Sequence, residues 1–572
     1  MSDVLRLMII VLYSWLVLGL IFIGSGILIS RIFRRKIEQE EDILKFFWIG
    51  WAFVILILQL WHSLFPVNCW IFVFLSITGA VGLLCCWKDL FRLVKRNLLK
   101  IGIFLFIVLM IGTWLSNRAV CSDKLYDTGL YHLNSVHWTT TCPIVPGLGN
   151  LHGRLAFNNS YFLYAALLEV GPWTLKSQHL SGGLLLLVLF SQILLSVHKI
   201  FQGKSGIQTY HVFNIIIFTP ILIMGFSDHI SSLSPDLPIF VLGIVLSSWL
   251  LELIESQKKN SQEKEFAVFS IIIMAVLGIT IKISFLAFGL FAALTAAIAG
   301  LFDKGKLHHF NRKKMIIWSV ICAMMFLVPW VGRGVILSGY MFYPSTIASF
   351  PVEWRLPKLA VVEAANWIRG WARKPNVHWK EVLANWDWLK PWANRTLKDY
   401  EVVVPMLLLL IGCILLFCSR FHRIKKQKSQ RKKWLFLFPA LFSLVYWFFT
   451  APALRFAGAC FWILGVGVLV FGIKNFKLKK TMTLCFALLI LLSWLIQERK
   501  HLGKDLMRSK VYPLRYAELK RFKTNSGLII YVPKKGDQCW NGPLLCTPFP
   551  NGALRLRKEG DISKGFVLDL KD

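Results

Sequence analysis

Residues 4–30 of the chain, VLRLMIIVLYSWLVLGLIFIGSGILIS, decide its fold class. The stretch carries one charged side chain, Arg6, and is otherwise almost wholly apolar or small. A helix over it rises about 40 Å, which exceeds the roughly 30 Å hydrocarbon core of a bilayer. The run is too long for the apolar core of a signal peptide and lacks a small-residue cleavage pattern, so we predict a membrane span.

Similar runs recur along the 572 residues, of which 56% are hydrophobic. Lipid offers the backbone no hydrogen-bond partners, so each run is expected to be a helix; barrel strands would alternate polar and apolar residues, and these do not. The sequence therefore predicts an all-α polytopic membrane protein with about 14 transmembrane helices. The predicted spans are residues 4–30, 46–64, 69–87, 101–117, 180–198, 212–226, 237–253, 266–281, 284–302, 315–331, 403–418, 434–449, 458–473 and 481–496.

Basic residues give these helices a direction. The net charge of +35 would suggest nucleic acid in a soluble protein, but here the charge lies mostly in every second connecting loop. The basic loops are residues 31–36, 88–100, 304–314, 420–433 and 474–480. The positive-inside rule places them in the cytoplasm and accounts for the charge without nucleic acid. We therefore predict a multi-pass protein of the bacterial inner (cytoplasmic) membrane whose N- and C-termini are both extracytoplasmic.

The spans divide the chain into membrane regions and large extracytoplasmic segments. The predicted parts are a four-helix membrane region (1–117), a loop with a candidate catalytic site (118–179), central membrane helices (180–331), a Trp-rich loop (332–402), C-terminal membrane helices (403–497) and a small tail domain (498–572). Seven tryptophans and several cations in the Trp-rich loop indicate amphipathic helices at the membrane interface; a small folded cap is the alternative.

The tail domain has features of a small exported module. Two short runs, 527–532 and 565–568, are typical of strands, and turn-forming residues separate them. Cys539 and Cys546 are candidates for a disulfide because the predicted compartment is oxidising; two free thiols are the alternative.

The densest polar stretch is YDTGLYHLNSVHW at 126–138. With α-helical spacing, Asp127, Tyr131, Asn134 and Trp138 share one face. A carboxylate at this place, just after a span, could accept a proton from an acceptor hydroxyl or hold a metal ion. The alternative interpretation of Asp127 is a helix N-cap.

A second segment, PIVPGLGNLHGRLAFNNS at 143–160, follows directly. Its two prolines and three glycines exclude a regular helix. A loop of this kind exposes backbone N–H groups that can hold an anion, and His152 and Arg154 add donors for a phosphate. The alternative is a rigid surface connector.

Four further charged residues stand at predicted outer ends of spans: Asp236, Lys282, Arg333 and Arg455. Lys282 lies within an apolar stretch, where a cation is costly and indicates function. Cations that converge near the outer leaflet would suit a lipid-linked phosphate or pyrophosphate. The alternatives are a helix cap for Asp236, and a snorkelling, carboxylate-paired or headgroup-anchoring role for the cations.

Three motifs carry a resemblance: YDTGLYH at 126–132, PIVPGLGNLHGR at 143–154, and CW at 539–540 with CTP at 546–548. In these the chain resembles, over nearly its whole length, a family of uncharacterised bacterial polytopic membrane proteins. More distantly it resembles the GT-C glycosyltransferases, which use polyprenyl-phosphate sugars and carry an essential acid in an early extracytoplasmic loop. Two features depart from that pattern, because Asp127 follows about the fourth span and its neighbour Thr128 is not a second acid.

The resemblance implies a glycosyltransferase that moves a sugar from a polyprenyl-phosphate carrier to a cell-envelope glycan or lipid. Asp127 would be the general base, assisted by His132 or His152, and Lys282, Arg333 and Arg455 would hold the donor phosphate. Tyr131, Asn134, Arg154 and Asp236 complete the candidate substrate site. Membrane lipid and the lipid-linked sugar are the expected partners, while protein partners are unknown and the cofactor stays open, a divalent metal included.

Two other function classes fit the same composition. One is a transporter or flippase of lipid-linked glycans, which should show paired repeats and helices broken at mid-membrane; we find no clear internal repeat. The other is a non-catalytic scaffold of an envelope polysaccharide complex. It predicts that no single polar substitution in 126–154 removes function.

Overall fold

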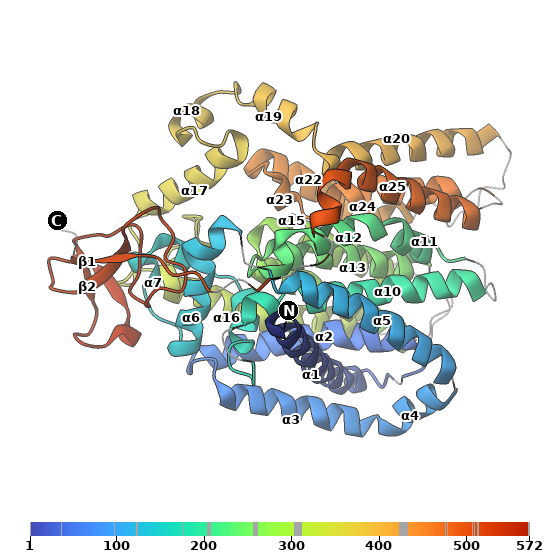
Figure 1. Cartoon of the computed structure of the whole chain (residues 1–572), viewed down its shortest axis with the longest axis horizontal. Coiled ribbons are helices and arrows are strands. Elements are labelled where there is room, and N and C mark those ends of the chain that lie inside the picture. The colour runs from blue at the N-terminus through green and yellow to red at the C-terminus, as the bar shows by residue number, and fades with distance from the viewer. Residues whose placement is uncertain are drawn as a thin grey trace.

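The computed structural model is mostly α-helical, and its strands β1–β4 all lie in the tail domain (Figure 1). It describes residues 2–35, 37–96, 98–121, 124–173, 176–202, 207–255, 261–301, 312–421, 433–474, 476, 479–505, 507, 510–511 and 514–569.

Eleven single or paired helices in the described residues are long and apolar enough to cross a membrane. They are α1 (Ser2–Ile32), α2 (Glu40–His62), α5 (Leu98–Ala119), α9 with α10 (Ser177–Leu180, Gly183–Gln202), α11 with α12 (Thr209–Ile216, Phe218–Phe226), α13 (Asp236–Glu255), α14 (Ser261–Ile281), η4 with α15 (Ile283–Phe285, Leu286–Leu301), α16 (Arg312–Ser338), α20 (Tyr400–Phe421) and α25 (Lys479–Asp505). The count rises to twelve if α3 (Cys69–Cys85) and α4 (Trp87–Arg96), bent by 61°, form one span. The chain therefore has the helices of a polytopic membrane protein.

Every predicted span overlaps one of the apolar helices, but two overlap only short ones. These are η5 with α22 (Trp434–Leu437, Phe438–Thr450) and α24 (Cys460–Lys474). As a 15-residue helix, α24 rises only about 22 Å, less than the hydrocarbon core. The long apolar run from 266 to 302 divides at Lys282, as predicted, since α14 ends at Ile281 and η4 begins at Ile283.

Small residues let the first helices approach closely. A Cβ added to Gly24 of α1 would lie 1.9 Å from the carbonyl oxygen of Gly79 in α3, and one added to Gly50 of α2 would lie 1.7 Å from that of Phe22. In lipid, helices associate through such close packing rather than through a hydrophobic driving force. The three helices therefore form one tightly packed unit.

The three segments predicted to be extracytoplasmic pack together at one end of the bundle. The side-chain amide of Asn150 donates to the carbonyl oxygens of Trp354, 2.9 Å away, and of Phe566, 3.2 Å away. One side chain thus joins the 118–179 loop, the Trp-rich loop and the tail domain.

Charged residues in and next to the predicted cytoplasmic loops form ion pairs with one another. Glu255, the last residue of α13, accepts hydrogen bonds from Lys433 at 2.9 Å and Lys474 at 2.7 Å. Arg35 reaches Glu263 at 3.0 Å. Parts of these loops lie outside the described residues, namely 36, 97, 304–311, 422–432, 475 and 477–478.

The Trp-rich loop contains three helices of its own and arches away from the bundle (Figure 1). Its helices are α17 (Lys358–Arg373), α18 (Trp379–Ala384) and α19 (Leu389–Thr396). Trp388 and Trp392 pack against Trp447 at the end of α22, whereas Trp371 and Trp386 stay exposed. The loop therefore has both a small core and an exposed aromatic face.

The tail domain contains two antiparallel pairs, β1 (Leu519–Lys523) with β2 (Ile529–Pro533), and β3 (Leu554–Leu556) with β4 (Phe566–Leu568). The sequence predicted β2 and β4 but missed their partners. β1, with sequence LKRFK, carries three cations and is mostly exposed, and β3 is only three residues long. Cys539 and Cys546 form a disulfide in this domain.

Candidate functional site

Asp127 lies where the helical segment that begins at Tyr126 passes into a π-helical turn. That turn, η1 (Thr128–His132), continues into α6 (Leu133–Thr141). The extra residue per turn breaks the α-helical spacing on which the predicted common face of Asp127, Tyr131 and Asn134 rested. Asp127 makes no side-chain capping hydrogen bond, so the N-cap interpretation is wrong.

The carboxylate of Asp127 pairs instead with Arg455 in the short helix α23 (Leu454–Ala457). The Arg455 Nη1 donates to Asp127 Oδ2 at 2.8 Å; the Asp127 side chain is 18% exposed and the Arg455 side chain 44%. Burial opposes ionisation of the carboxyl, but Arg455 and other nearby cations outweigh it and hold the pKa of Asp127 below its ordinary value. Asp127 is thus ionised and reachable from solvent.

A second ion pair lies beside the first. Lys282, in the turn between α14 and η4, pairs with Asp236 at the start of α13. The ring of Phe456 joins the two pairs, because Lys282 Nζ lies 4.5 Å and the Arg455 guanidinium carbon 4.9 Å from its centroid. Both cations therefore contact one aromatic ring, an arrangement that stabilises their convergence.

Arg154 approaches the same region from the 143–160 loop. Its positive charge lowers the pKa of Asp127, and its guanidinium carbon lies 5.6 Å from the centroid of the Phe157 ring. No ion pair joins Arg154 to a carboxylate within the described chain. We name Asp127, Arg154, Asp236, Lys282 and Arg455 the charged cluster.

His132 is buried and lies one π-helical turn after Asp127 in the sequence. Its Nδ1 lies 3.3 Å from the hydroxyl of Thr128, which in turn lies 3.1 Å from the hydroxyl of Ser232. Burial lowers the pKa of His132 to about 4, although nearby carboxylates oppose this. The imidazole is therefore neutral near pH 7 and fixed by hydroxyl contacts.

His152 lies next to Arg154 but does not reach Asp127. It is buried, its ring centroid lies 5.6 Å from that of Phe549 in the tail domain, and burial together with Arg154 lowers its pKa to about 3. Among described residues no contact joins His152 to Asp127. Of the two histidines predicted to assist the acid, the structure brings only His132 near it.

Arg333 also lies in a separate site. Its Nη1 donates to His62 Nδ1 at 2.6 Å and its Nε to Asn158 Oδ1 at 3.4 Å. The predicted grouping of Arg333 with Lys282 and Arg455 is therefore wrong, because α16 carries it to a different neighbour, α2.

Asn134 is 2% exposed, and its amide has no hydrogen-bond partner in the described chain. Tyr131 is buried against His132, with ring centroids 4.4 Å apart.

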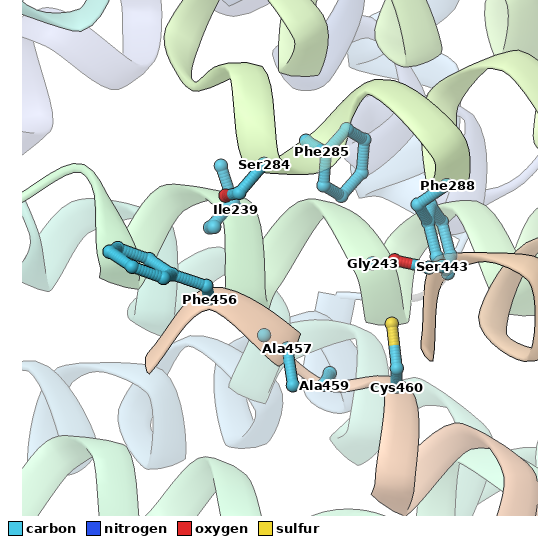
Figure 2. Close-up of a pocket in the computed structure, with 11 residues that line it drawn as sticks. Ile239, Gly243, Ser284, Phe285, Phe288, Ser443, Phe456, Ala457, Ala459 and Cys460 are labelled. Atoms are coloured by element: carbon cyan, nitrogen blue, oxygen red, sulfur yellow. The ribbon is translucent and has the colours of Figure 1, made fainter. Parts of the chain in front are cut away.

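A small, mainly apolar pocket adjoins the charged cluster (Figure 2). Phe456 lines it together with Ile239 of α13 and Phe288 of α15, and the turn before α24 closes another side. Because Phe456 also contacts Lys282 and Arg455, apolar surface and fixed positive charge meet at one residue. Sequence reasoning missed Phe456; its position next to Arg455 was the only available signal.

No group of three or more His, Cys, Asp or Glu side chains in the described residues is placed to hold a metal ion. The carboxylates of Asp127 and Asp236 each face a cation instead. In the described chain, the charged cluster therefore consists of these two ion pairs and Arg154.

Comparison with known proteins places most of the chain in one family. The pattern of the family described as "Domain of unknown function (DUF8201)" matches residues 8–462. The chain belongs to this family. The match includes every member of the charged cluster and ends before the tail domain. No curated protein and no solved structure matches the chain.

Proposed function

We propose that this DUF8201 protein is a glycosyltransferase of the inner-membrane surface that takes its sugar from a polyprenyl-phosphate carrier. One observation carries the proposal: at the ends of apolar helices Asp127 pairs with Arg455, and Arg455 and Lys282 both contact the ring of Phe456. A lipid phosphate needs fixed cations beside apolar surface, and an acceptor hydroxyl needs a base.

The chemistry needs only one carboxylate. Asp127 takes the proton of the acceptor hydroxyl as that oxygen forms a bond to the anomeric carbon of the sugar. The bond from the anomeric carbon to the phosphate oxygen breaks, and its electron pair leaves with the polyprenyl phosphate. Arg455, Lys282 and Arg154 stabilise the negative charge of this leaving group.

The ion pair between Asp127 and Arg455 gives donor binding a second effect. While Arg455 contacts Asp127, the pKa of the carboxyl is low and the carboxylate is a weak base. A donor phosphate attracts the guanidinium toward itself and so relieves the carboxylate of part of that charge. The pKa of Asp127 then rises toward the range in which it accepts a proton more readily.

The proposal places the charged cluster on the outer face of the membrane. The basic loops favour this orientation by the positive-inside rule. Resemblance to GT-C enzymes adds to it through the acid in an early extracytoplasmic loop. In the same orientation the exposed tryptophans of the Trp-rich loop lie near the lipid headgroups.

The test uses full-length protein in nanodiscs with a panel of synthetic polyprenyl-phosphate sugars and a bacterial envelope extract as acceptor. Released polyprenyl phosphate and labelled acceptor are measured together. We expect transfer from at least one donor, and a loss of about 100-fold or more in Asp127→Asn, because a general base contributes about that much. The matched control is Asp228→Asn. Asp228 is an aspartate outside the charged cluster, and its carboxylate lies 3.9 Å from Lys124 Nζ.

Full transfer by Asp127→Asn would exclude the proposed base. If the panel gave no transfer but labelled donor crossed the bilayer of vesicles containing the protein, a flippase would replace the enzyme. Unchanged function throughout an alanine scan of 126–154 would favour the scaffold.

A further inference from the structure

The tail domain touches the segment that carries Asp127 on both sides of this residue. The backbone N–H of Trp540 donates to the carbonyl oxygen of Gly129 at 2.9 Å. Before Asp127, the side chain of Gln538 donates to the carbonyl oxygen of Tyr126 at 2.8 Å. These contacts join positions about 410 apart in sequence, since Gln538 and Tyr126 are separated by 412.

Gly129 is the point of closest approach. A Cβ added there would lie 2.7 Å from two atoms of the Trp540 indole, Cδ2 and Cε2. Any side chain at 129 would therefore push the indole away. The glycine of the motif at 126–132 has this packing reason in addition to any role in the π-helical turn.

Trp540 is held in an uncommon backbone conformation. Its φ of 47° is in the left-handed region, which a bulky L-residue seldom adopts without support. Support comes from the disulfide of its neighbour Cys539 with Cys546, and from Arg515, whose guanidinium carbon lies 4.8 Å from the centroid of the indole ring. We name residues 539–546 the disulfide loop.

The disulfide loop is in turn fixed to β2. The backbone N–H of Tyr531 donates to the carbonyl oxygen of Leu545, and the backbone N–H of Thr547 donates to the carbonyl oxygen of Tyr531, each at 2.9 Å. Both cysteines are fully buried. The chain of contacts thus runs from β2 through the disulfide loop and Trp540 to Gly129.

From the other side, the segment before α13 holds the same turn through Thr128, whose hydroxyl lies 3.1 Å from that of Ser232. The turn therefore lies between this segment and the tail domain. Since Asp127 directly precedes this turn, its distance to Arg455 depends on both contacts.

We propose that the disulfide loop of the tail domain positions Asp127 against Arg455, with Trp540 as the positioning residue. Only the role of Asp127 rests on the proposed function; the contacts do not. Reduction of the disulfide should therefore free the disulfide loop. A dithiol such as dithiothreitol supplies two electrons and two protons, becomes a cyclic disulfide, and leaves two thiols at 539 and 546. Residues 8–462 match the family pattern, so the site is completed from outside that region.

The test measures hydrogen–deuterium exchange of residues 125–141 in full-length protein in nanodiscs. Compared are the wild type, Trp540→Ala, Trp540→Phe and the double variant Cys539→Ser/Cys546→Ser. We expect the amides of 128–133 to exchange at least about 10-fold faster in Trp540→Ala and in the double variant, and at near wild-type rates in Trp540→Phe. Trp386→Ala is the matched control, because Trp386 is 60% exposed.

Two exchange results would overturn the inference. One is unchanged exchange of 128–133 in Trp540→Ala. The other is an equal increase throughout α13 and α14, which would make the tail domain a support of the whole fold rather than of this turn.

A functional readout separates this inference from the proposed function. If the protein transfers sugar, Trp540→Ala should lower kcat about 10- to 100-fold, with a smaller effect on KM, and should move the acid limb of the pH profile upward, because Asp127 loses part of its contact with Arg455. An increase in local exchange without transfer by any variant would keep the positioning role and reject the glycosyltransferase. Normal kcat and pH profile in a variant with raised local exchange would reject the positioning role.

Discussion

Arg455 donates a hydrogen bond to Asp127 at 2.8 Å across 328 positions of sequence. The pair joins the only acid of the YDTGLYH motif to the short helix α23, which lies between α22 and α24 in the sequence. The ion pair stabilises the contact most when the pH is above the pKa of the Asp127 carboxyl, because the carboxylate is then ionised. The contact therefore links the basicity of Asp127 to whatever Arg455 binds.

Replacement of Arg455 should move the pH dependence of activity. Burial raises the pKa of Asp127 and the charge of Arg455 lowers it. In Arg455→Gln that charge is lost, so the pKa of Asp127 should rise. A base is lost as the pH falls through its pKa, so the acid limb of transfer should move to higher pH. The measurement is the pH profile of kcat. Arg369→Gln, on the exposed side of α17, is the control, and a profile in Arg455→Gln that matches this control would show that Arg455 does not set the pKa of Asp127.

The pair between Lys282 and Asp236 should be costly to break singly. Their side chains are only 18% and 9% exposed, and removal of one partner from a buried pair costs about 3–5 kcal/mol. Lys282→Met and Asp236→Leu should each lower the free energy of unfolding in bicelles by an amount of this order. The double variant should be more stable than either single variant. Additive losses would mean that the two side chains do not interact.

The hydrogen bond between Arg333 and His62 fixes the imidazole tautomer. A guanidinium only donates, so His62 Nδ1 accepts at 2.6 Å and Nε2–H donates to the carbonyl oxygen of Cys142 at 3.1 Å. His62→Gln can keep an acceptor and a donor, whereas His62→Leu leaves the buried guanidinium with a lost partner. We expect the Leu variant to be less stable than the Gln variant by about 2 kcal/mol, measured by unfolding in bicelles. Equal stabilities would argue against this hydrogen bond.

The orientation can be tested with single cysteines and a membrane-impermeant maleimide. Lys358→Cys in α17 and Lys88→Cys at the start of α4 are both exposed in the structure. In intact spheroplasts we expect labelling of the first and not the second, and labelling of both after permeabilisation. The unmodified chain gives the background from its native cysteines. The reverse pattern would place the charged cluster in the cytoplasm and remove the proposed donor.

The all-helical class and the approximate bounds of the long apolar helices follow from the sequence alone, but their number does not: about 14 spans were predicted, and 11 helices in the described residues, or up to 12, are long enough. Each long apolar run, such as 4–30, has to satisfy its backbone hydrogen bonds within itself in lipid, so composition and length determine both its structure and its limits. The break at Lys282 followed for the same reason, because one helix cannot span the run from 266 to 302. Short strands such as β1 and β3 were missed because their residues give no alternation of apolar and polar side chains over so few positions.

The candidate site was only partly determined in this way. The residue types at Asp127, Lys282 and Arg455 indicated chemistry, and the sequence supplied them individually. Which of them meet was decided by tertiary packing: α23 brings Arg455 to Asp127, α16 carries Arg333 to His62, and the tail domain places Trp540 on Gly129. Periodicity describes only neighbours within one helix, whereas a contact between distant segments depends on how all the helices pack. The sequence therefore specified the charges of this protein, and the packing of its helices specified their partners.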